Sequence, residues 1–472
     1  MRYVSTRGAA PALAFDEVLL AGLARDGGLY VPDSWPVFTA DDWRAMRGLA
    51  YPELVARVIR PFVGGTIDQA TLERLTAQAY RGFDHPAIAP LKQMDAGLWL
   101  MELFHGPTLA FKDFALQLLG LLFDHVLTQR GQRCTIVGAT SGDTGSAAIE
   151  ACRDRPSLDV FMLHPFGRVS EVQRRQMTTV LSANVHNIAV DGSFDDCQDL
   201  LKGLFNDLAF RDRVGLSAVN SINWARIVAQ VAYYAHAALS LGAPERRLAV
   251  AVPSGNFGNV YSAYAARAIG LPIERLIIGS NRNDILTRFF DTGAMAIGTV
   301  HPTLSPSMDI QVSSNLERLL FDLYDRDGAA TAKAMQSFRA DGRLDVGAAR
   351  LKRAQALFGA TRYDDDETKA IIAREFKASG EVLDPHSAIG VAAGRAAQCP
   401  RDLPVVALAT AHPAKFPDAV EQAIGRRPAL PDRLKDLYAR EERCMRLPND
   451  LGALREFILA RGGARDGKRS AA

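Results

Sequence analysis

The stretch RCTIVGATSGDTGSAAIEACRD, residues 133–154, indicates the fold class. Its opening RCTIVGAT is typical of a strand, because β-branched and small apolar side chains dominate it. The closing GSAAIEACRD is rich in alanine and favours a helix, and small polar residues connect the two. A strand that leads directly into a helix is the repeating half of a βαβ unit.

The same alternation continues to about residue 280. Four further β-rich runs each lead into a helical run, and a fifth closes the series. These runs are DVFMLHP, NVHNIAV, GLSAVN, RLAVAVP and IERLIIGSN. Repeated βα units predict parallel sheets with helices on both faces, so we expect an α/β fold.

The pattern divides the chain into three predicted domains and a tail. Two are parallel-sheet αβα domains, and the third, at the N-terminus, is mainly helical. The predicted bounds are 1–95 for the N-terminal domain, 133–228 for a small αβα domain, 96–132 and 229–460 for a large αβα domain with an insertion at about 281–380, and 461–472 for the tail. The tail is rich in glycine and charge and is expected to be disordered.

Composition indicates an ordinary globular protein with little net charge. The 472 residues are 48% hydrophobic and 23% charged, with a net charge of +2. We therefore expect no nucleic-acid or membrane partner. The five cysteines are scattered and form no CxxC pair, and no secretory signal opens the sequence. These features predict a cytoplasmic protein without a metal site. We expect a monomer or small homo-oligomer, although these features do not determine the oligomeric state.

Three loops follow predicted strands: ATSGDTGSA, PSGNFGN and LATAHPAKF. In parallel sheets, ligands bind beyond the carboxyl ends of the strands. The glycines of PSGNFGN let the backbone approach a ligand, and the helix that follows adds a positive end, which suits a phosphate. The alternative is a tight turn without a ligand. In SGDTG, Ser141 and Thr144 could hold a carboxylate, or the loop could simply cap its helix through Asp143.

The stretch FHGPTLAFKDFALQLLGLLF, residues 104–123, places Lys112 at the start of an apolar helix. The helix dipole and the apolar neighbours both disfavour a charged amine there, so they favour the neutral, nucleophilic form. A nucleophilic lysine together with a phosphate cradle suggests pyridoxal phosphate. The alternative is a lysine that reaches solvent and pairs with Asp113.

These motifs together resemble the threonine synthase family, pyridoxal-phosphate enzymes of the tryptophan-synthase-β-like fold, fold type II. The resemblance covers nearly the whole chain. It is carried in order by STRG, DGGLYVP, FHGPTLAFKDFALQ, GATSGDTGSAA, NSINWARI, VPSGNFGN, DPHSAIG and ATAHPAKF.

The resemblance implies a cofactor between the two αβα domains and a role for each motif. Lys112 would bind pyridoxal 5'-phosphate as a Schiff base and later move protons, and Thr410 would meet the pyridine nitrogen. The cofactor phosphate would be bound by Gly255, Asn256, Phe257, Gly258 and Asn259. The amino-acid end of the substrate, or the cofactor hydroxyl, would be contacted by Thr140, Ser141, Asp143 and Thr144. The implied reaction converts O-phospho-L-homoserine and water to L-threonine and phosphate.

A phosphorylated substrate needs a second anion site. NSINWARI offers Ser221, Asn223 and Arg226 just beyond a predicted strand, and arginine suits bidentate contact with phosphate. The alternative is a surface charge on a helix, and Lys415 is a second candidate for the phosphate.

Two other functions stay open from the residues alone. A serine or threonine dehydratase-like lyase of the same fold would not need Arg226 for a phosphate. A non-catalytic relative that binds phosphorylated amino acids would not need Lys112. His105, His386 and His412 fall in motifs, but we expect hydrogen-bonding loop residues rather than catalysts, and Asp384 is expected to cap a helix.

Overall fold

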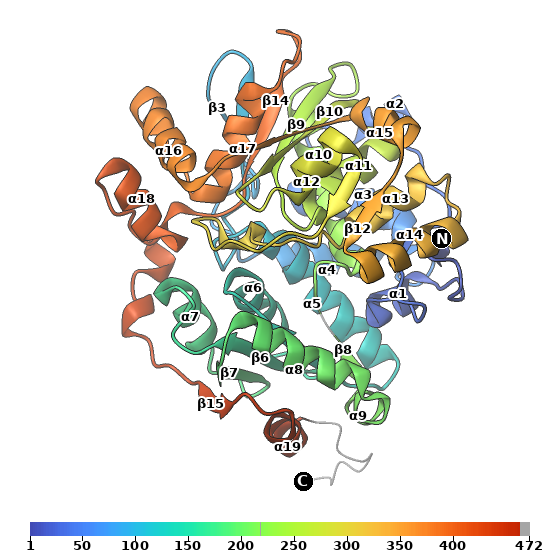
Figure 1. The fold of residues 1–472 in the computed structure, drawn as a ribbon, viewed down its shortest axis with the longest axis vertical. Helices are drawn as coiled ribbons and strands as arrows, with labels where there is room; N and C mark the ends of the chain where they lie inside the picture. The colour runs from blue at the N-terminus through green and yellow to red at the C-terminus, as the bar shows by residue number, and fades with distance from the viewer. Residues whose placement is uncertain (218, 463–472) are drawn as a thin grey trace. The chain divides into compact units, whose positions relative to one another are not determined.

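The computed structural model describes residues 1–217 and 219–462, which fall into two compact units (Figure 1). Unit 1 consists of Met1–Ala115 and Ser221–Ala429. Unit 2 consists of Leu116–Asn220 and the chain that follows Ala429. Helix α5 (Lys112–Gln129) begins in unit 1 and continues into unit 2.

A six-stranded sheet forms the centre of unit 1. Its strands, in spatial order, are β13 (Phe358–Arg362), β10 (Ile273–Ser280), β9 (Leu248–Pro253), β14 (Val405–Ala409), β4 (Leu98–Glu102) and β3 (Leu91–Gln93). All neighbours run parallel except β3, which pairs antiparallel with β4 at the edge. Every residue of β9 and β14 is buried, because helices cover both faces of a parallel sheet.

Helices cover this sheet as the alternating pattern predicts. Helix α17 (Pro385–Ala396) packs on β14, β9 and β10, and α16 (Asp365–Ser379) packs on α17. Helix α11 (Gly258–Ala268) packs against β10 and β9, with α10 (Trp224–Ser240) outside it. Figure 1 shows the two pairs on opposite sides of β9 and β10. The predicted α/β fold with parallel sheets is confirmed.

The rest of unit 1 is mainly helical. Its further helices are α1 (Phe15–Ala21), α2 (Ala40–Ala45), α3 (Tyr51–Val63), α4 (Gln69–Tyr80), α12 (Ile285–Thr292), α13 (Leu316–Leu323), α14 (Gly328–Asp341), α15 (Ala348–Gln355) and α18 (Pro417–Ile424), with 3-10 turns η1 (Pro306–Met308) and η2 (Pro413–Lys415). Two antiparallel pairs join β1 (Tyr3–Ser5) to β2 (Tyr30–Pro32) and β11 (Ala294–Ala296) to β12 (Arg343–Asp345). Among the described residues, no helix has the length and apolar character needed to cross a bilayer.

Unit 2 has a five-stranded parallel sheet of its own. The spatial order is β15 (Met445–Pro448), β7 (Val185–Asp191), β6 (Leu158–Pro165), β5 (Cys134–Ala139) and β8 (Leu216–Ser217). Its further helices are α6 (Asp143–Cys152), α7 (Glu171–Thr178), α8 (Phe194–Asn206), α9 (Leu208–Val214) and α19 (Leu451–Arg461), with 3-10 turns η3 (Asp432–Leu434) and η4 (Leu437–Ala439). Leucine and phenylalanine side chains of α8 and α19 pack on β5, β6 and β7 as one core.

The unit boundaries differ from the predicted domains. Residues 1–95 cluster with unit 1, where α3 packs on α10 and Arg7 forms a buried ion pair with Glu317 at 2.9 Å. The chain after Ala429 belongs to unit 2, because β15 pairs with β7 and α19 packs on α8. A strand's apolar pattern shows that it joins a sheet, but not which sheet it joins.

Two smaller predictions, on an insertion and on the tail, also differ from the structure. The region 281–380 is not wholly an insertion, because β13 within it forms an edge of the main sheet. Helix α19 ends at Arg461, the first residue of the predicted tail, and residues 463–472 of that tail lie outside the described residues.

Candidate active site

Three of the predicted motifs follow the carboxyl ends of strands in the six-stranded sheet of unit 1. The loop PSGNFGN follows β9, ATAHPAKF follows β14, and FHGPTLAFK follows β4. Strand β14 lies between β9 and β4 and is parallel to both. The carboxyl ends of the three strands therefore meet where parallel sheets bind ligands.

The segment before Lys112 is held against the end of β14. The amide of Phe111 donates to the carbonyl of Thr410 at 2.9 Å, and the amide of His412 donates to the carbonyl of Leu109 at 3.0 Å. Leu109 has φ +64°, a left-handed conformation that costs a non-glycine residue about 1–3 kcal/mol. Backbone bonds to a buried strand end fix this conformation and, with it, the start of α5.

Lys112 is the first residue of α5 and is only 7% exposed. Its Nζ donates to the hydroxyl of Ser307 at 3.5 Å and lies 5.0 Å from the ring centre of Phe111. Asp113 accepts hydrogen bonds from the amide of Thr108, at 2.8 Å, and from its hydroxyl, at 2.7 Å. Burial rules out a lysine that reaches solvent, and Asp113 binds Thr108 in the segment that precedes the helix.

Thr410 lies beside this lysine segment. It is 5% exposed, and its amide donates to the hydroxyl of Ser387 at 3.0 Å. Because its carbonyl accepts from Phe111, Thr410 is fixed next to the residue that precedes Lys112.

The loop PSGNFGN has the conformation of an anion cradle. Phe257 has φ +61° and precedes α11, which begins at Gly258. The first turn of a helix leaves its amides without intrahelical acceptors, and the helix dipole adds positive potential there. The loop is held from outside, since the hydroxyl of Ser313 donates to the carbonyl of Gly255 at 2.8 Å and the amide of Ser314 donates to Asn256 Oδ1 at 2.9 Å.

The glycines of the cradle are also required by the protein's own packing. A Cβ on Gly255 would lie 2.9 Å from Met308 Cα, and a Cβ on Gly258 would lie 3.2 Å from Asn315 Nδ2. A side chain at Gly255 would push the loop away from η1, and a side chain at Gly258 would require Asn315, at the start of α13, to shift. Packing against these distant segments could not be predicted from the loop sequence.

Asn259 provides a test of whether the cradle fits a phosphate. The residue is 6% exposed, and its Oδ1 accepts hydrogen bonds from the hydroxyls of Tyr233 and Tyr234. Its Nδ2 has no hydrogen-bond partner among the described residues. A buried donor without an acceptor is costly, and an anion at the helix start could accept from it. The residues present therefore fit the phosphate of pyridoxal phosphate, with Lys112 at the same sheet edge.

The NSINWARI motif places its three predicted residues in different environments. The hydroxyl of Ser221 accepts from Asn256 Nδ2, so Ser221 lies against the cradle. Asn223 caps α10, accepting from the amide of Ala225 at 3.0 Å and donating to the carbonyl of Leu19 at 2.9 Å. Both polar atoms of Asn223 are thus engaged in the fold, which favours a structural role over the predicted contact with substrate.

Arg226 lies in the first turn of α10 and is 4% exposed. Burial lowers the pKa of its guanidinium to about 10, and the nearby Tyr233 acts in the opposite direction. The group is still a cation at neutral pH. It is therefore a buried positive charge rather than the surface charge that the alternative reading required.

Lys415, the second candidate for the substrate phosphate, has a structural contact. It is fully buried in η2, and its Nζ donates to the carbonyl of Thr108 at 2.7 Å. This bond connects the ATAHPAKF loop to the segment before Lys112, so Lys415 supports the position of that segment.

The SGDTG loop belongs to unit 2. Thr140 Oγ1 accepts from the amides of Gly142 and Gly145, both at 2.9 Å, and closes the loop at the start of α6. The cap residue of α6 is Gly142 rather than Asp143, whose Oδ1 accepts from Gln173 Nε2 at 2.8 Å. Ser141 and Thr144 are half-buried, and their hydroxyls lie at the positive end of α6.

The sequence did not predict Ser307 as a site residue, nor its hydrogen bond with His386. The amide of Ser307 donates to His386 Nε2 at 3.3 Å, and His386 Nδ1 lies 2.9 Å from Asp384 Oδ1. Asp384 caps α17 as predicted, accepting from the amides of His386 and Ser387. The DPHS sequence signals this cap, but no local pattern shows that a residue 79 positions away completes the contact.

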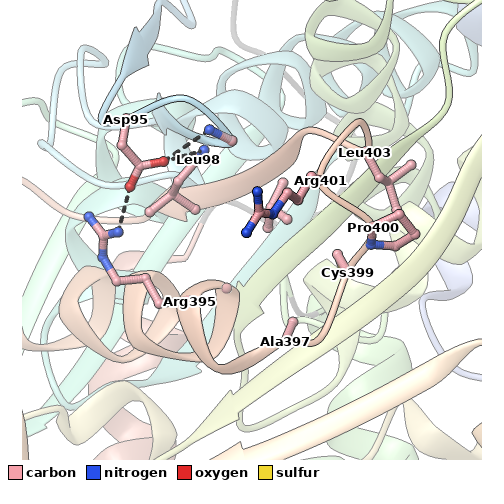
Figure 2. Close-up of a pocket in the computed structure, with 11 residues that line it drawn as sticks. Asp95, Leu98, Arg395, Ala397, Cys399, Pro400, Arg401 and Leu403 are labelled. Atoms are coloured by element: carbon pink, nitrogen blue, oxygen red, sulfur yellow. Dashed lines mark hydrogen bonds and ion pairs between the residues drawn. The ribbon is translucent and has the colours of Figure 1, made fainter.

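The opposite edge of the same sheet contains a cavity of about 220 Å³ where β4 and β14 begin. Asp95 and Arg395, which lie side by side among its lining residues in Figure 2, form an ion pair at 2.5 Å. Arg395 also binds Glu375 at 2.8 Å. Arg395 is therefore held by two carboxylates, and none of the predicted motifs lines this cavity.

Comparison with known proteins shows which family the chain belongs to. The model for the threonine synthase N terminus matches residues 2–80, that for the threonine synthase C-terminal region matches residues 387–458, and that for pyridoxal-phosphate dependent enzymes matches residues 84–411. A threonine synthase from Pseudomonas aeruginosa is 56% identical over 98% of this chain and 99% of its own.

Two solved structures are similar over the whole chain. Threonine synthase from Brucella melitensis with bound pyridoxal phosphate has a TM-score of 0.96 and 53% identity, covering 98% of this chain and 100% of its own. Threonine synthase from yeast has a TM-score of 0.92 and 36% identity, covering 98% of both chains. The chain thus belongs to the threonine synthase family of pyridoxal-phosphate-dependent enzymes.

Proposed function

We propose that this chain converts O-phospho-L-homoserine and water to L-threonine and phosphate, with pyridoxal 5'-phosphate as its cofactor. The observation that carries the proposal is the buried Lys112 beside Thr410, at the sheet edge that also holds the Gly-rich cradle. Similarity to threonine synthases over 98% of the chain supports it.

Three parts of unit 1 would hold the cofactor. Lys112 would bind its aldehyde carbon, residues 255–259 its phosphate, and the Thr410 hydroxyl would face its ring nitrogen. When bound, pyridoxal phosphate supplies a conjugated electron sink for negative charge that develops on the substrate. A neutral hydroxyl at the ring nitrogen does not favour protonation there as a carboxylate would, so Thr410 would moderate that sink.

Lys112 Nζ would also move the protons of the reaction. It would take a proton from Cα and then one from Cβ of the substrate, after which the γ-phosphate would leave. Protons would return to Cγ, which becomes the methyl group, and to Cα, while water would add its hydroxyl at Cβ and its remaining proton would go to the released phosphate. General acid–base transfer by one positioned side chain contributes roughly 10²–10⁴-fold to a rate. The 7% exposure of Lys112 limits proton exchange with bulk water during these steps.

Arg226 would grip the phosphate of the substrate, with Ser221 beside it. Burial makes its contact with a phosphate strong, because charge-assisted hydrogen bonds gain strength away from water. In unit 2, the hydroxyls of Ser141 and Thr144 and the start of α6 would bind the carboxylate of the substrate. We assign Thr140 and Asp143 to ordering that loop, since Thr140 binds its amides and Asp143 binds Gln173.

We place the enzyme in the cytoplasm, as a monomer or small homo-oligomer without nucleic-acid or membrane partners. All five cysteines are free thiols, which suits a reducing compartment. The net charge of +2 gives no general attraction to polyanions.

The decisive experiment incubates the purified protein with O-phospho-L-homoserine and measures threonine and phosphate together. Equal amounts of the two products are expected. Borohydride reduction followed by peptide mapping should place the cofactor on Lys112. Release of a 2-oxo acid from serine or threonine, at a rate above threonine formation, would instead favour a dehydratase, and no turnover with bound cofactor would favour a binding protein.

A further inference from the structure

A chain of buried polar contacts within unit 1 leads from Lys112 to a carboxylate. Lys112 Nζ donates to Ser307 Oγ at 3.5 Å, the amide of Ser307 donates to His386 Nε2 at 3.3 Å, and His386 Nδ1 lies 2.9 Å from Asp384 Oδ1. Asp384 is fully buried and His386 is 4% exposed. The proton transfer proposed for Lys112 does not by itself require this arrangement, so it calls for its own explanation.

The contacts determine which nitrogen of His386 carries the proton. An amide can only donate, so Nε2 must accept from Ser307 and has no hydrogen. The proton then lies on Nδ1 and is donated to Asp384. Asp384 is itself fixed, because it also accepts from the amides of His386 and Ser387 at the start of α17. A rigid helix start thus presents Nε2 as a fixed acceptor.

Ser307 needs such a fixed acceptor because it lies in an irregular part of the chain. It is the middle residue of the three-residue turn η1, between β11 and α13. On one side of this turn, Asp309 accepts from Asn281, Asn283 and Thr303 and ties it to the region after β10. On the other side His386 holds the amide of Ser307 itself. The two ties together fix where the Ser307 hydroxyl points.

The same carboxylate also steadies the other side of the lysine. The Ser387 hydroxyl donates to Asp384 Oδ2 and accepts from the amide of Thr410, whose carbonyl accepts from Phe111. Asp384 is therefore connected to Lys112 through Ser307 and, by a separate route, through the residue that precedes the lysine. Asp384, His386, Ser387 and Thr410 on these routes are buried, and Ser307 and Phe111 are half-buried.

We propose that His386, held by Asp384, is a positioning residue for the reaction, because it fixes Ser307 and thereby the direction of the Lys112 amine. The proposal rests on the proposed function, in which that amine moves protons. The Nζ–Oγ distance of 3.5 Å is at the limit of a hydrogen bond. A small shift of η1 therefore decides whether Ser307 orients the amine.

The test compares Ser307→Ala, His386→Ala and His386→Gln with the wild-type holoenzyme. Glutamine can offer an oxygen near the position of Nε2, so His386→Gln should restore much of what His386→Ala loses. We expect kcat to fall roughly ten- to a hundred-fold in Ser307→Ala and His386→Ala, since a misplacement of about 1 Å can cost about 10²-fold. KM for O-phospho-L-homoserine should stay within about twofold, because the proposed contact acts on proton transfer rather than on binding.

Ser305→Ala is the matched control for a lost serine hydroxyl. Ser305 is 1% exposed on the same segment, but its hydroxyl binds Asn281 instead of pointing toward the lysine. If Ser305→Ala lowered kcat as much as Ser307→Ala, the effect would be general loosening of the segment and the proposal would be wrong.

A measurement independent of turnover reads the tautomer directly. In protein labelled with ¹⁵N-histidine, His386 should carry its proton on Nδ1, and the proton should keep that position in Ser307→Ala, which retains the amide. A proton on Nε2 in the wild type would overturn the proposal. No threonine from the wild type would overturn the proposed function itself, whereas an active wild type with an equally active His386→Ala would overturn only the positioning role.

Discussion

In the six-stranded sheet of unit 1, buried polar groups make different contacts at the amino ends and at the carboxyl ends of the strands. At the edge where β4 and β14 begin, Arg395 binds both oxygens of Glu375, at 2.9 and 2.8 Å, and pairs with Asp95. At the edge where they end, Lys112 donates to a serine hydroxyl and Lys415 donates to a backbone carbonyl. At one of these ends Arg395 is held by two carboxylates, and at the other Lys112 and Lys415 contact a hydroxyl and a backbone carbonyl.

This difference separates a stabilising arrangement from one suited to chemistry. A charge paired with a carboxylate in bidentate geometry is held in place and has little to offer a ligand. Lys112 and Lys415 instead lie beside the loops that carry the predicted motifs. Strand β14 is apolar throughout and β4 is apolar except for its last residue, Glu102, so the loops make most of the difference. Parallel sheets place their ligand sites at the carboxyl edge in this way.

The largest effect is expected from Lys112, which lies at the carboxyl ends of the strands. Lys112→Ala should lower kcat by about 10³-fold or more, because it removes the proton-moving group and the cofactor's covalent attachment. Far-ultraviolet circular dichroism should be unchanged, since a smaller side chain replaces a buried cation. Threonine formation and the cofactor's absorption are the measurements. A variant with more than a tenth of wild-type kcat would remove Lys112 from the reaction.

Arg226 should give the next largest effect. Arg226→Ala should lower kcat/KM for O-phospho-L-homoserine roughly ten- to a hundred-fold, since a hydrogen bond to a charged group contributes about 1.5–3 kcal/mol. Any slow reaction with serine, which lacks the phosphate, serves as the internal control and should change little. Equal losses on both substrates would show that Arg226 supports the fold or the cofactor instead.

A pair of glycine variants compares the carboxyl and amino ends of the strands directly. A Cβ on Gly255 would lie 2.9 Å from Met308 Cα, whereas a Cβ on Gly97, at the opposite edge, would meet nothing within 4 Å. Overpacking costs about 1–3 kcal/mol, so Gly255→Ala should weaken cofactor binding by roughly five- to a hundred-fold. Gly97→Ala should leave it within twofold, as followed by absorption during titration with pyridoxal phosphate. Similar affinities in the two variants would mean that the cradle tolerates a displaced η1 segment.

The smallest effect on activity is expected from Arg395, which lies at the amino ends of the strands. Arg395→Ala leaves the buried carboxylate of Glu375 without this partner, and an unsatisfied buried acceptor costs about 1–3 kcal/mol. The free energy of unfolding in urea should fall by that amount while kcat/KM stays within twofold. A tenfold loss of kcat/KM would show that this edge also contributes to the reaction.

The sequence by itself determined the fold class and the family. Alternating β-rich and helical runs from residue 133 onward predicted parallel sheets, because strand and helix patterns depend on local spacing of apolar residues. The Gly-rich loop and the lysine at the start of an apolar helix predicted the cofactor, since each motif is contiguous and carries its chemistry in a few residues. The family models and solved structures confirm both predictions.

Only the tertiary structure decided how distant segments complete the site. It showed that Asn223 caps a helix, that Lys415 supports the lysine segment, and that β15 joins the sheet of unit 2. It also brought Ser307 to Lys112 and His386, across 195 and 79 positions of the chain. The physical reason is the same in each case. These contacts are single hydrogen bonds or strand pairings between segments far apart in sequence, and local apolar spacing contains no information about which distant partner a polar group or an edge strand will meet.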